Sequence, residues 1–78
     1  MMITLTIKQN NREAFDIQVP SRQRVVDTLQ ILYENNLIYL EHDMLESKIW
    51  SERKKQQINL EYSYEQNAIY TADILKIG

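Results

Sequence analysis

One histidine, four serines and eleven acidic residues are the side chains of this sequence that we first consider for catalysis. His42 lies between Glu41 and Asp43, so a carboxylate on each side could favour its charged form or help it bind a metal. Because neighbouring side chains point in different directions in a helix or a strand, the three cannot easily converge on one ion. We expect His42 to be a solvated surface residue, and the chain to hold no metal or other cofactor.

Nucleophilic chemistry also lacks its partners in this sequence. A catalytic serine needs a base that takes its proton, and none accompanies any of the four serines, Ser21, Ser47, Ser51 and Ser63. The acidic residues are scattered among polar positions, and a chain with one glycine contains no glycine-rich phosphate loop. A chain this short also leaves little room for a substrate pocket of roughly 300 Å³ or more. We therefore expect that the protein is not an enzyme.

Binding of single-stranded nucleic acid would use basic side chains together with aromatic rings on which bases stack. The chain offers the basic run 53–55, and three tyrosines follow it, Tyr62, Tyr64 and Tyr70. However, glutamates interrupt the same region, and a formal net charge of −2 gives no general attraction to phosphates. We predict no nucleic-acid partner, a solvated hairpin turn at 52–55, and tyrosines that cover an edge of the core with their hydroxyls in water.

Length and composition restrict the fold that positions any binding residue. A chain of 78 residues with no Cys and a single His builds one small core, which neither a disulfide nor a structural metal supports. We therefore expect one domain over residues 1–78, stabilised by packing alone. No apolar run approaches the ~20 residues that cross a bilayer, and no secretory signal opens the chain. We expect a cytoplasmic protein without direct membrane insertion.

Alternating apolar and polar residues predict a β-hairpin at the N-terminus, with strands over 2–8 and 15–19. Ser21 is placed to cap a helix that begins at Arg22, and apolar residues recur there at three- and four-residue steps. The helix is predicted to stop at the asparagine pair 35–36, since Asn tolerates the left-handed conformation that is common just past a helix end.

The second half of the chain predicts shorter elements. The apolar residues of 37–47 fit a short helix as well as an irregular connection, and that segment stays undecided. The other predictions are a strand at 48–51, the charged turn at 52–55, a strand around 57–60, a polar surface connection at 61–70 and a closing strand at 73–77. A lone helix needs a sheet to cover its apolar face, and two hairpins that flank one helix are naturally joined by a last strand between their first members. The order therefore predicts an α+β fold of the β-grasp type, with a mixed sheet of four to five strands packed on one main helix.

Several short motifs resemble the YukD/EsaB family. They are Val19-Pro20, the helical Val25-Val26-Asp27-Thr28-Leu29, the lysine-rich turn before Gln57-Ile58, and the closing Ala72-Asp73-Ile74-Leu75-Lys76-Ile77. The resemblance covers nearly the whole chain and implies a ubiquitin-like β-grasp domain. It further implies a small cytosolic accessory or regulatory factor of the type VII (Ess/Yuk) secretion systems of Gram-positive bacteria, which acts by binding protein and not by catalysis. Its partner would be a larger protein, such as a membrane-associated component of that system.

The chain departs from this family at two places. Where such proteins usually carry a Gly before the last strand, the sequence has Thr71-Ala72-Asp73, so another residue would have to take any left-handed turn conformation. The chain also ends with the single Gly78 and lacks the flexible Gly-Gly tail of ubiquitin-like carriers. We therefore expect that a carrier or modifier acting through Gly78 is the weaker alternative function.

The direction in which Trp50 points determines where a binding surface would lie. If Ile49 points toward the helix, strand alternation turns Trp50 to the open face of the sheet and places Ile74 beside it. The position of Trp50 and Ile74 resembles the apolar sheet patch through which ubiquitin is recognised. The predicted protein-binding face consists of an apolar centre, Trp50 and Ile74, and a polar rim, Thr4, Thr6, Lys8, Lys48 and Lys76.

Two alternatives to this face stay open. A register shift by one residue would bury Trp50 in the core and turn Ile49 outward. A homo-oligomer, formed by a self-associating structural subunit that pairs through the Trp50 face or an edge strand, would use the surface for copies of the same chain.

Overall fold

The computed structural model describes residues 1–41 and 43–78, so the prediction for His42 lies outside the described residues. The described part contains five strands, one α-helix and one 3₁₀ helix. In chain order they are β1 (Met2–Gln9), β2 (Phe15–Pro20), α1 (Val25–Glu34), the 3₁₀ helix η1 (Met44–Glu46), β3 (Ile49–Ser51), β4 (Gln56–Gln57) and β5 (Ile74–Ile77). Neither helix of this part has the length and hydropathy of a membrane span.

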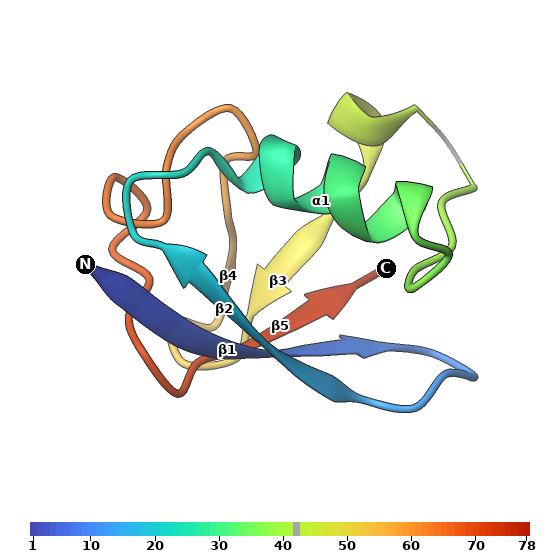
Figure 1. Ribbon diagram of the computed structural model, residues 1–78, viewed down its shortest axis with the longest axis horizontal. Helices are drawn as coiled ribbons and strands as arrows, with labels where there is room; N and C mark the ends of the chain where they lie inside the picture. The colour runs from blue at the N-terminus through green and yellow to red at the C-terminus, as the bar shows by residue number, and fades with distance from the viewer. Residues whose placement is uncertain (42) are drawn as a thin grey trace.

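The strands form one mixed sheet in the order β2-β1-β5-β3-β4. β1 and β5 run parallel at its centre, whereas each of the other pairs is antiparallel. Figure 1 shows α1 crossing one face of this sheet. The last strand lies between the first strands of two hairpins, and one helix covers the sheet. The predicted α+β fold of the β-grasp type is therefore confirmed.

The core lies between α1 and the inner face of the sheet. In β1, β3 and β5 the odd-numbered residues point inward, because alternate side chains of a strand share one face. The buried apolar residues of the strands and the helix are Ile3, Leu5, Ile7, Val19, Val25, Leu29, Leu32, Ile49, Leu75 and Ile77. Each such side chain contributes about 1.5–3 kcal/mol when it leaves water. The even-numbered residues of these strands are left for the opposite face.

α1 begins at Val25, later than predicted. The residue at its N-cap is Arg24, whose side chain makes no capping hydrogen bond. The N–H of Val25 donates instead to Tyr62 O at 3.0 Å, and the N–H of Val26 donates to Leu60 O at 2.8 Å. The first N–H groups of a helix need partners from outside it, and here a distant connection supplies two of them.

Ser21 does not cap α1, so this prediction is wrong. The residue is buried, and its backbone joins two other segments. Its N–H donates to Met1 O at 2.7 Å, and its carbonyl accepts from the N–H of Glu65 at 2.8 Å. These bonds hold Ser21 before the helix, in the turn between β2 and α1.

The predicted helix stop at the asparagine pair is confirmed. Asn36 has a φ of 59°, in the left-handed region. Its N–H donates to Tyr33 O at 3.1 Å, and the N–H of Leu37 donates to Leu32 O at 2.9 Å. The two bonds satisfy carbonyls of the last turn in the Schellman pattern. The undecided segment 37–47 that follows is mainly irregular, with η1 as its one short helix among the described residues.

The second hairpin is shorter than predicted, and β4 does not extend over 57–60. Lys55 takes a φ of 56°, and its N–H donates to Ser51 O at 2.8 Å, which closes the turn. Ile58 and Leu60 alternate toward the core and are both buried, as the pattern indicates. The N–H of Ile58 still donates to Ile49 O of β3 at 3.0 Å, whereas the carbonyl of Leu60 accepts from α1, so the segment leaves the sheet between Ile58 and Leu60.

The connection 61–70 does not only cross the surface, as predicted, but also contributes a side chain to the core. Tyr64 is 1% exposed and lies in the core, whereas Tyr62 and Tyr70 are exposed. The prediction of a hydroxyl in water is therefore wrong for Tyr64. Burial raises the pKa of Tyr64 to about 12, and a hydrogen bond with Thr28 on α1 opposes part of that rise. The buried Tyr64 side chain thus connects the segment 61–70 to α1.

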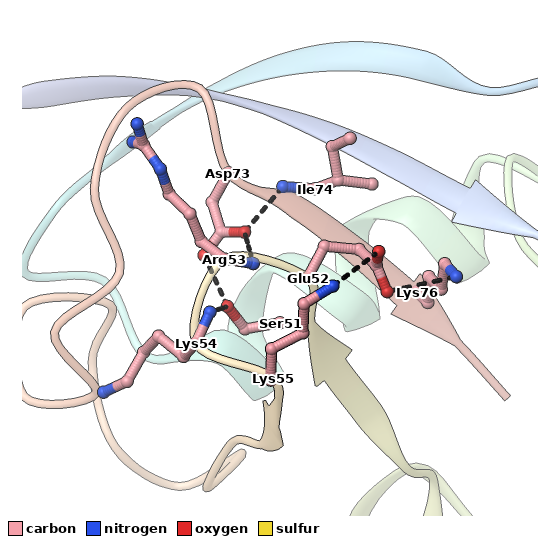
Figure 2. Close-up of polar contacts among 8 residues, drawn as sticks. All are labelled: Ser51, Glu52, Arg53, Lys54, Lys55, Asp73, Ile74 and Lys76. Atoms are coloured by element: carbon pink, nitrogen blue, oxygen red, sulfur yellow. Dashed lines mark hydrogen bonds and ion pairs between the residues drawn. The ribbon is translucent and has the colours of Figure 1, made fainter.

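A buried carboxylate joins the turn 52–55 to the closing strand. Asp73 immediately precedes β5 and is 2% exposed. Its oxygens accept from Ser51 Oγ at 2.6 Å, from the Arg53 N–H at 3.1 Å and from the Ile74 N–H at 2.7 Å, as Figure 2 shows. The Ser51 hydroxyl in turn accepts from the Lys54 N–H at 3.2 Å. A carboxylate without such partners would be costly to bury, so the network holds β3 and β5 in one arrangement.

Asp73→Ala is expected to lower the free energy of unfolding by about 2–4 kcal/mol, because it leaves the Ser51 hydroxyl and two backbone N–H groups without their acceptor. Asp73→Asn keeps one acceptor oxygen and should cost less. Urea denaturation followed by circular dichroism measures both. The control is Asp16→Ala, since Asp16 is exposed and accepts from Thr6 Oγ1 in water. An equal loss in the control would contradict this account.

Ala72 takes the left-handed turn before the last strand, with a φ of 75°. Its N–H donates to Thr4 O at 2.8 Å, and Thr71 Oγ1 accepts from the Thr4 N–H at 3.1 Å. A side chain in this region costs roughly 1 kcal/mol or more. The contacts with β1 therefore hold an alanine where a glycine would be unstrained.

Ala72→Gly is expected to raise the free energy of unfolding by up to about 1 kcal/mol, because relief of the left-handed conformation outweighs the added chain entropy of the unfolded state. Ala14→Gly is the matched control at an exposed residue outside the left-handed region. It should lower the same quantity by about 0.5–1 kcal/mol. Urea denaturation of the two variants measures these changes. A free energy of unfolding that falls in both variants would show that Ala72 is not strained.

Candidate functional site

The face of the sheet opposite α1 carries the even-numbered strand residues. Thr6 lies opposite Ile74, Lys8 lies opposite Lys76, and Lys76 lies opposite Trp50. Lys48 immediately precedes β3. All seven residues of the predicted binding face are exposed or half-buried, namely Thr4, Thr6, Lys8, Lys48, Trp50, Ile74 and Lys76. Their role in binding stays a prediction.

Trp50 and Ile74 form the apolar part of this open face. Trp50 is 40% exposed and Ile74 is 38% exposed, whereas Ile49 is buried in the core. The register that would bury Trp50 is therefore not the one that forms. Trp50 pairs with Lys76, two residues after Ile74, so Trp50 and Ile74 are diagonal neighbours on adjacent strands. Such positions are about 7–8 Å apart, within reach of an aromatic side chain.

Glu52 is a member of the open face that sequence reasoning missed. Its carboxylate pairs with Lys76 Nζ at 3.0 Å and with Lys55 Nζ at 3.8 Å, as Figure 2 shows. The hydrogen bond from Lys76 is the largest cause that holds the pKa of Glu52 below its usual value. The sequence does indicate this position of Glu52, because Glu52 follows Trp50 by two residues and strand alternation places both on one face.

Beside Trp50 the surface is hollowed. We call this depression of about 530 Å³ the basic hollow, and its lining residues are Lys8, Gln9, Asn10, Asn11, Arg12, Lys48, Trp50, Lys76, Ile77 and Gly78. It is larger than the chain length led us to expect. Most of its lining residues are exposed, so it is an open depression in the surface and not an enclosed pocket.

Hydrogen bonds between distant segments hold the wall of the basic hollow. The side-chain amide of Gln9 accepts from the Tyr39 N–H at 2.9 Å and donates to Tyr39 O. Arg12 Nη1 donates to Asn36 O at 3.4 Å, beyond the end of α1. The N–H of Gly78 donates to Lys48 O at 3.0 Å, which continues the pairing of β5 with β3. The sequence shows none of these contacts, because each joins residues far apart in the chain.

The seven predicted residues divide between two areas. Four of them, Lys8, Lys48, Trp50 and Lys76, line the basic hollow. The other three, Thr4 and Thr6 on β1 and Ile74 on β5, lie outside it, and Thr6 Oγ1 donates to Asp16 Oδ1 at 2.6 Å. Arg12 joins the first group and was missed, because it lies in the loop between β1 and β2 and belongs to no strand pattern.

Acidic and metal-ligating side chains are dispersed over the structure. Within residues 1–41 and 43–78, no three His, Cys, Asp or Glu side chains lie close enough together to hold a metal ion. The prediction that the chain binds no cofactor stays a prediction. The geometry of the open face and the basic hollow offers surface contact through one aromatic ring and several cations.

Lys76→Gln is expected to raise the pKa of Glu52 toward its ordinary value of 4.5, because it removes the largest cause of the lowering. A folded-state pKa below the unfolded value means that Glu52 adds stability above the unfolded pKa, and that this is lost as the pH falls through the folded pKa. NMR titration of the side-chain carboxyl measures the shift. Lys8→Gln is the control of equal charge, and Lys8 forms no ion pair with any described residue. The same rise in both variants would contradict the assignment to Lys76.

Comparisons with known proteins bear on the architecture. No family model and no curated protein sequence matches this chain. Among solved structures, the ubiquitin-like domain of Plasmodium falciparum Dsk2 is similar with a TM-score of 0.68 at 15% identity, over 100% of both chains. The C-terminal ubiquitin-like domain of mouse tubulin-specific chaperone e gives 0.74 at 20% identity, over 97% of this chain and 84% of that one.

A third similar structure is the ubiquitin-like domain of an Arabidopsis thaliana protein, with a TM-score of 0.67 at 13% identity, over 99% of this chain and 76% of that one. All three similarities extend over nearly all of the present chain. Identities this low compare architecture and not function. Within residues 1–41 and 43–78, the five-stranded sheet, its strand order and its one α-helix are therefore those of the ubiquitin-like fold.

Proposed function

We propose that this protein is a non-catalytic interaction module that binds another protein through the open face of its sheet, centred on Trp50 and Ile74. The observation that carries the proposal is the exposure of Trp50 on a strand whose two other residues are buried. Trp is among the residue types most enriched at the energetic centres of protein interfaces. A partner that covers the ring would remove its apolar surface from water.

The surroundings of Trp50 support protein binding over a role in the core. The ring and Ile74 are bordered by threonines and lysines, and an apolar centre with a polar rim is typical of protein interfaces. The core is complete without Trp50, because Ile49 and Ser51 of the same strand supply its inward side chains. A substitution at Trp50 therefore tests binding without opening a cavity.

The proposed setting is the cytoplasm of a Gram-positive bacterium, where the protein acts as an accessory or regulatory factor of a type VII secretion system. The support is the resemblance of the motifs at 19–20, 25–29 and 72–77, and of the lysine-rich turn before 57–58, to the YukD/EsaB family. The ubiquitin-like fold agrees with the fold that this resemblance implies. The proposed partner is a larger, membrane-associated component of that system.

Trp50→Ala is expected to weaken binding to that component by about 2 kcal/mol or more, which is roughly thirtyfold in Kd. The free energy of unfolding should change by less than about 1 kcal/mol, because the ring is outside the core. Calorimetric titration with the purified cytosolic part of each membrane-associated component measures the first quantity, and urea denaturation measures the second.

Tyr62→Ala is the matched control, since Tyr62 is an exposed aromatic beside the start of α1. It should leave binding unchanged. Equal losses for both variants, or a Trp50→Ala variant that unfolds, would overturn the proposed face. Failure of the unaltered protein to bind any component would overturn the secretion role. A mass that rises with concentration in sedimentation, and falls in Trp50→Ala, would favour self-association instead.

A further inference from the structure

Positive charge concentrates in the basic hollow although the whole chain has a net charge of −2. Four of the nine Lys and Arg residues line it, namely Lys8, Arg12, Lys48 and Lys76. None of the eleven Asp and Glu residues, all of which lie in the described part of the chain, does so. An anionic ligand is therefore attracted to this part of the surface and meets mainly negative charge elsewhere.

Three of the four basic side chains, Lys8, Arg12 and Lys48, form no ion pair within residues 1–41 and 43–78, but Arg12 Nη1 already donates to Asn36 O at 3.4 Å. Both Lys8 and Lys48 are exposed. Lys76, by contrast, pairs with Glu52 at 3.0 Å. Lys8 and Lys48 are thus the cations of the hollow that can accept a carboxylate without breaking an existing contact.

The spacing around Trp50 suits an extended peptide. Lys8, Lys76 and Trp50 lie in one row across β1, β5 and β3. Adjacent strands are about 4.8 Å apart, so the backbones of Lys8 and Trp50 are about 10 Å apart. Lys48 precedes Trp50 by two residues, which is about 7 Å along a strand. In an extended peptide, a carboxylate two residues from an apolar side chain is also about 7 Å from it. The long lysine side chains can span the difference between this spacing and the distances from Trp50 to Lys8 and Lys48.

We propose that the basic hollow binds an acidic peptide segment of the partner, with one apolar side chain against Trp50 and carboxylates on Lys8 and Lys48. This inference rests on the proposed function and adds the chemistry of the partner. A nucleic acid fits less well, because a phosphate backbone that left the hollow along the open face would meet Glu52 and Asp16. Asp16 lies opposite Thr6 on that face, and like charges repel.

The single Trp50 reports occupation of the hollow directly. The probe is a synthetic peptide of about seven residues, with a central Leu flanked by Glu, titrated into the full chain while Trp50 emission is recorded. The reference peptide has Gln in place of every Glu. We expect the Glu peptide to shift the emission to the blue with saturation, and its affinity to fall as salt is added. The Gln peptide should bind at least about fivefold more weakly.

The Lys8→Gln/Lys48→Gln double variant should lose about fivefold or more in affinity for the Glu peptide, because two ion pairs are removed. Arg22→Gln/Arg24→Gln is the control, since it removes the same charge from the turn before α1. It should change the affinity by less than twofold. Equal losses in both double variants, or equal affinity for the Glu and Gln peptides, would overturn the inference. Tighter binding of a short oligothymidylate than of the Glu peptide at the same salt would also overturn it.

Failure of this inference can be distinguished from failure of the proposed function. If a protein partner binds in a way that depends on Trp50 but not on Lys8 and Lys48, the open face stands and the acidic ligand is wrong. If the Glu peptide binds at Lys8 and Lys48 but the protein partner binds Trp50→Ala as well as the unaltered chain, the hollow binds acidic peptides and the open face centred on Trp50 is wrong as the docking surface of that partner.

Discussion

The buried hydrogen bond between Ser51 Oγ and Asp73 Oδ2 is the constraint on which both faces of the sheet depend. It ties the end of β3 to the start of β5, in the register that pairs Trp50 with Lys76. Because strand alternation has a period of two, a slip of one residue would exchange core and solvent positions along β3. A buried polar pair that is satisfied in one register opposes that slip. The contact that stabilises the interior thus also decides which aromatic ring faces the solvent.

The sheet and its helix were largely predictable, because each buries one side only and the burial pattern therefore appears in the order of the residues. β1, β2 and β5 follow from alternation, and the end of α1 follows from the local conformational freedom of Asn36. The outward direction of Trp50 is a harder case. Alternation makes Trp50 and Ile49 point to opposite faces but does not say which face is which. The Ser51–Asp73 contact settles that question, and it joins residues 22 positions apart.

The predictions that failed depend on contacts between distant segments. Ser21 has the chemistry of a helix cap, yet Leu60 and Tyr62 offer their carbonyls to α1, and the helix starts where those carbonyls are. Tyr64 lies in a polar stretch without hydrophobic period, so no local pattern indicates that it fills the core. The basic hollow likewise has no local sequence pattern, because its wall is formed by the end of β1 and the loop after it, the start of β3 and the end of β5. Such sites become visible only when the chain is folded.

The ion pair between Glu52 and Lys76 has a consequence for the selectivity of the open face. A carboxylate held beside a lysine by the fold acts as a tethered competitor, with an effective concentration on the millimolar scale or above. Free monovalent carboxylates at lower concentration cannot displace it from Lys76. Additional contacts of a ligand with Trp50 and the unpaired lysines would add free energy that favours this displacement. The ion pair with Glu52 therefore lowers the affinity of Lys76 for small monovalent anions more than for a ligand that makes several contacts.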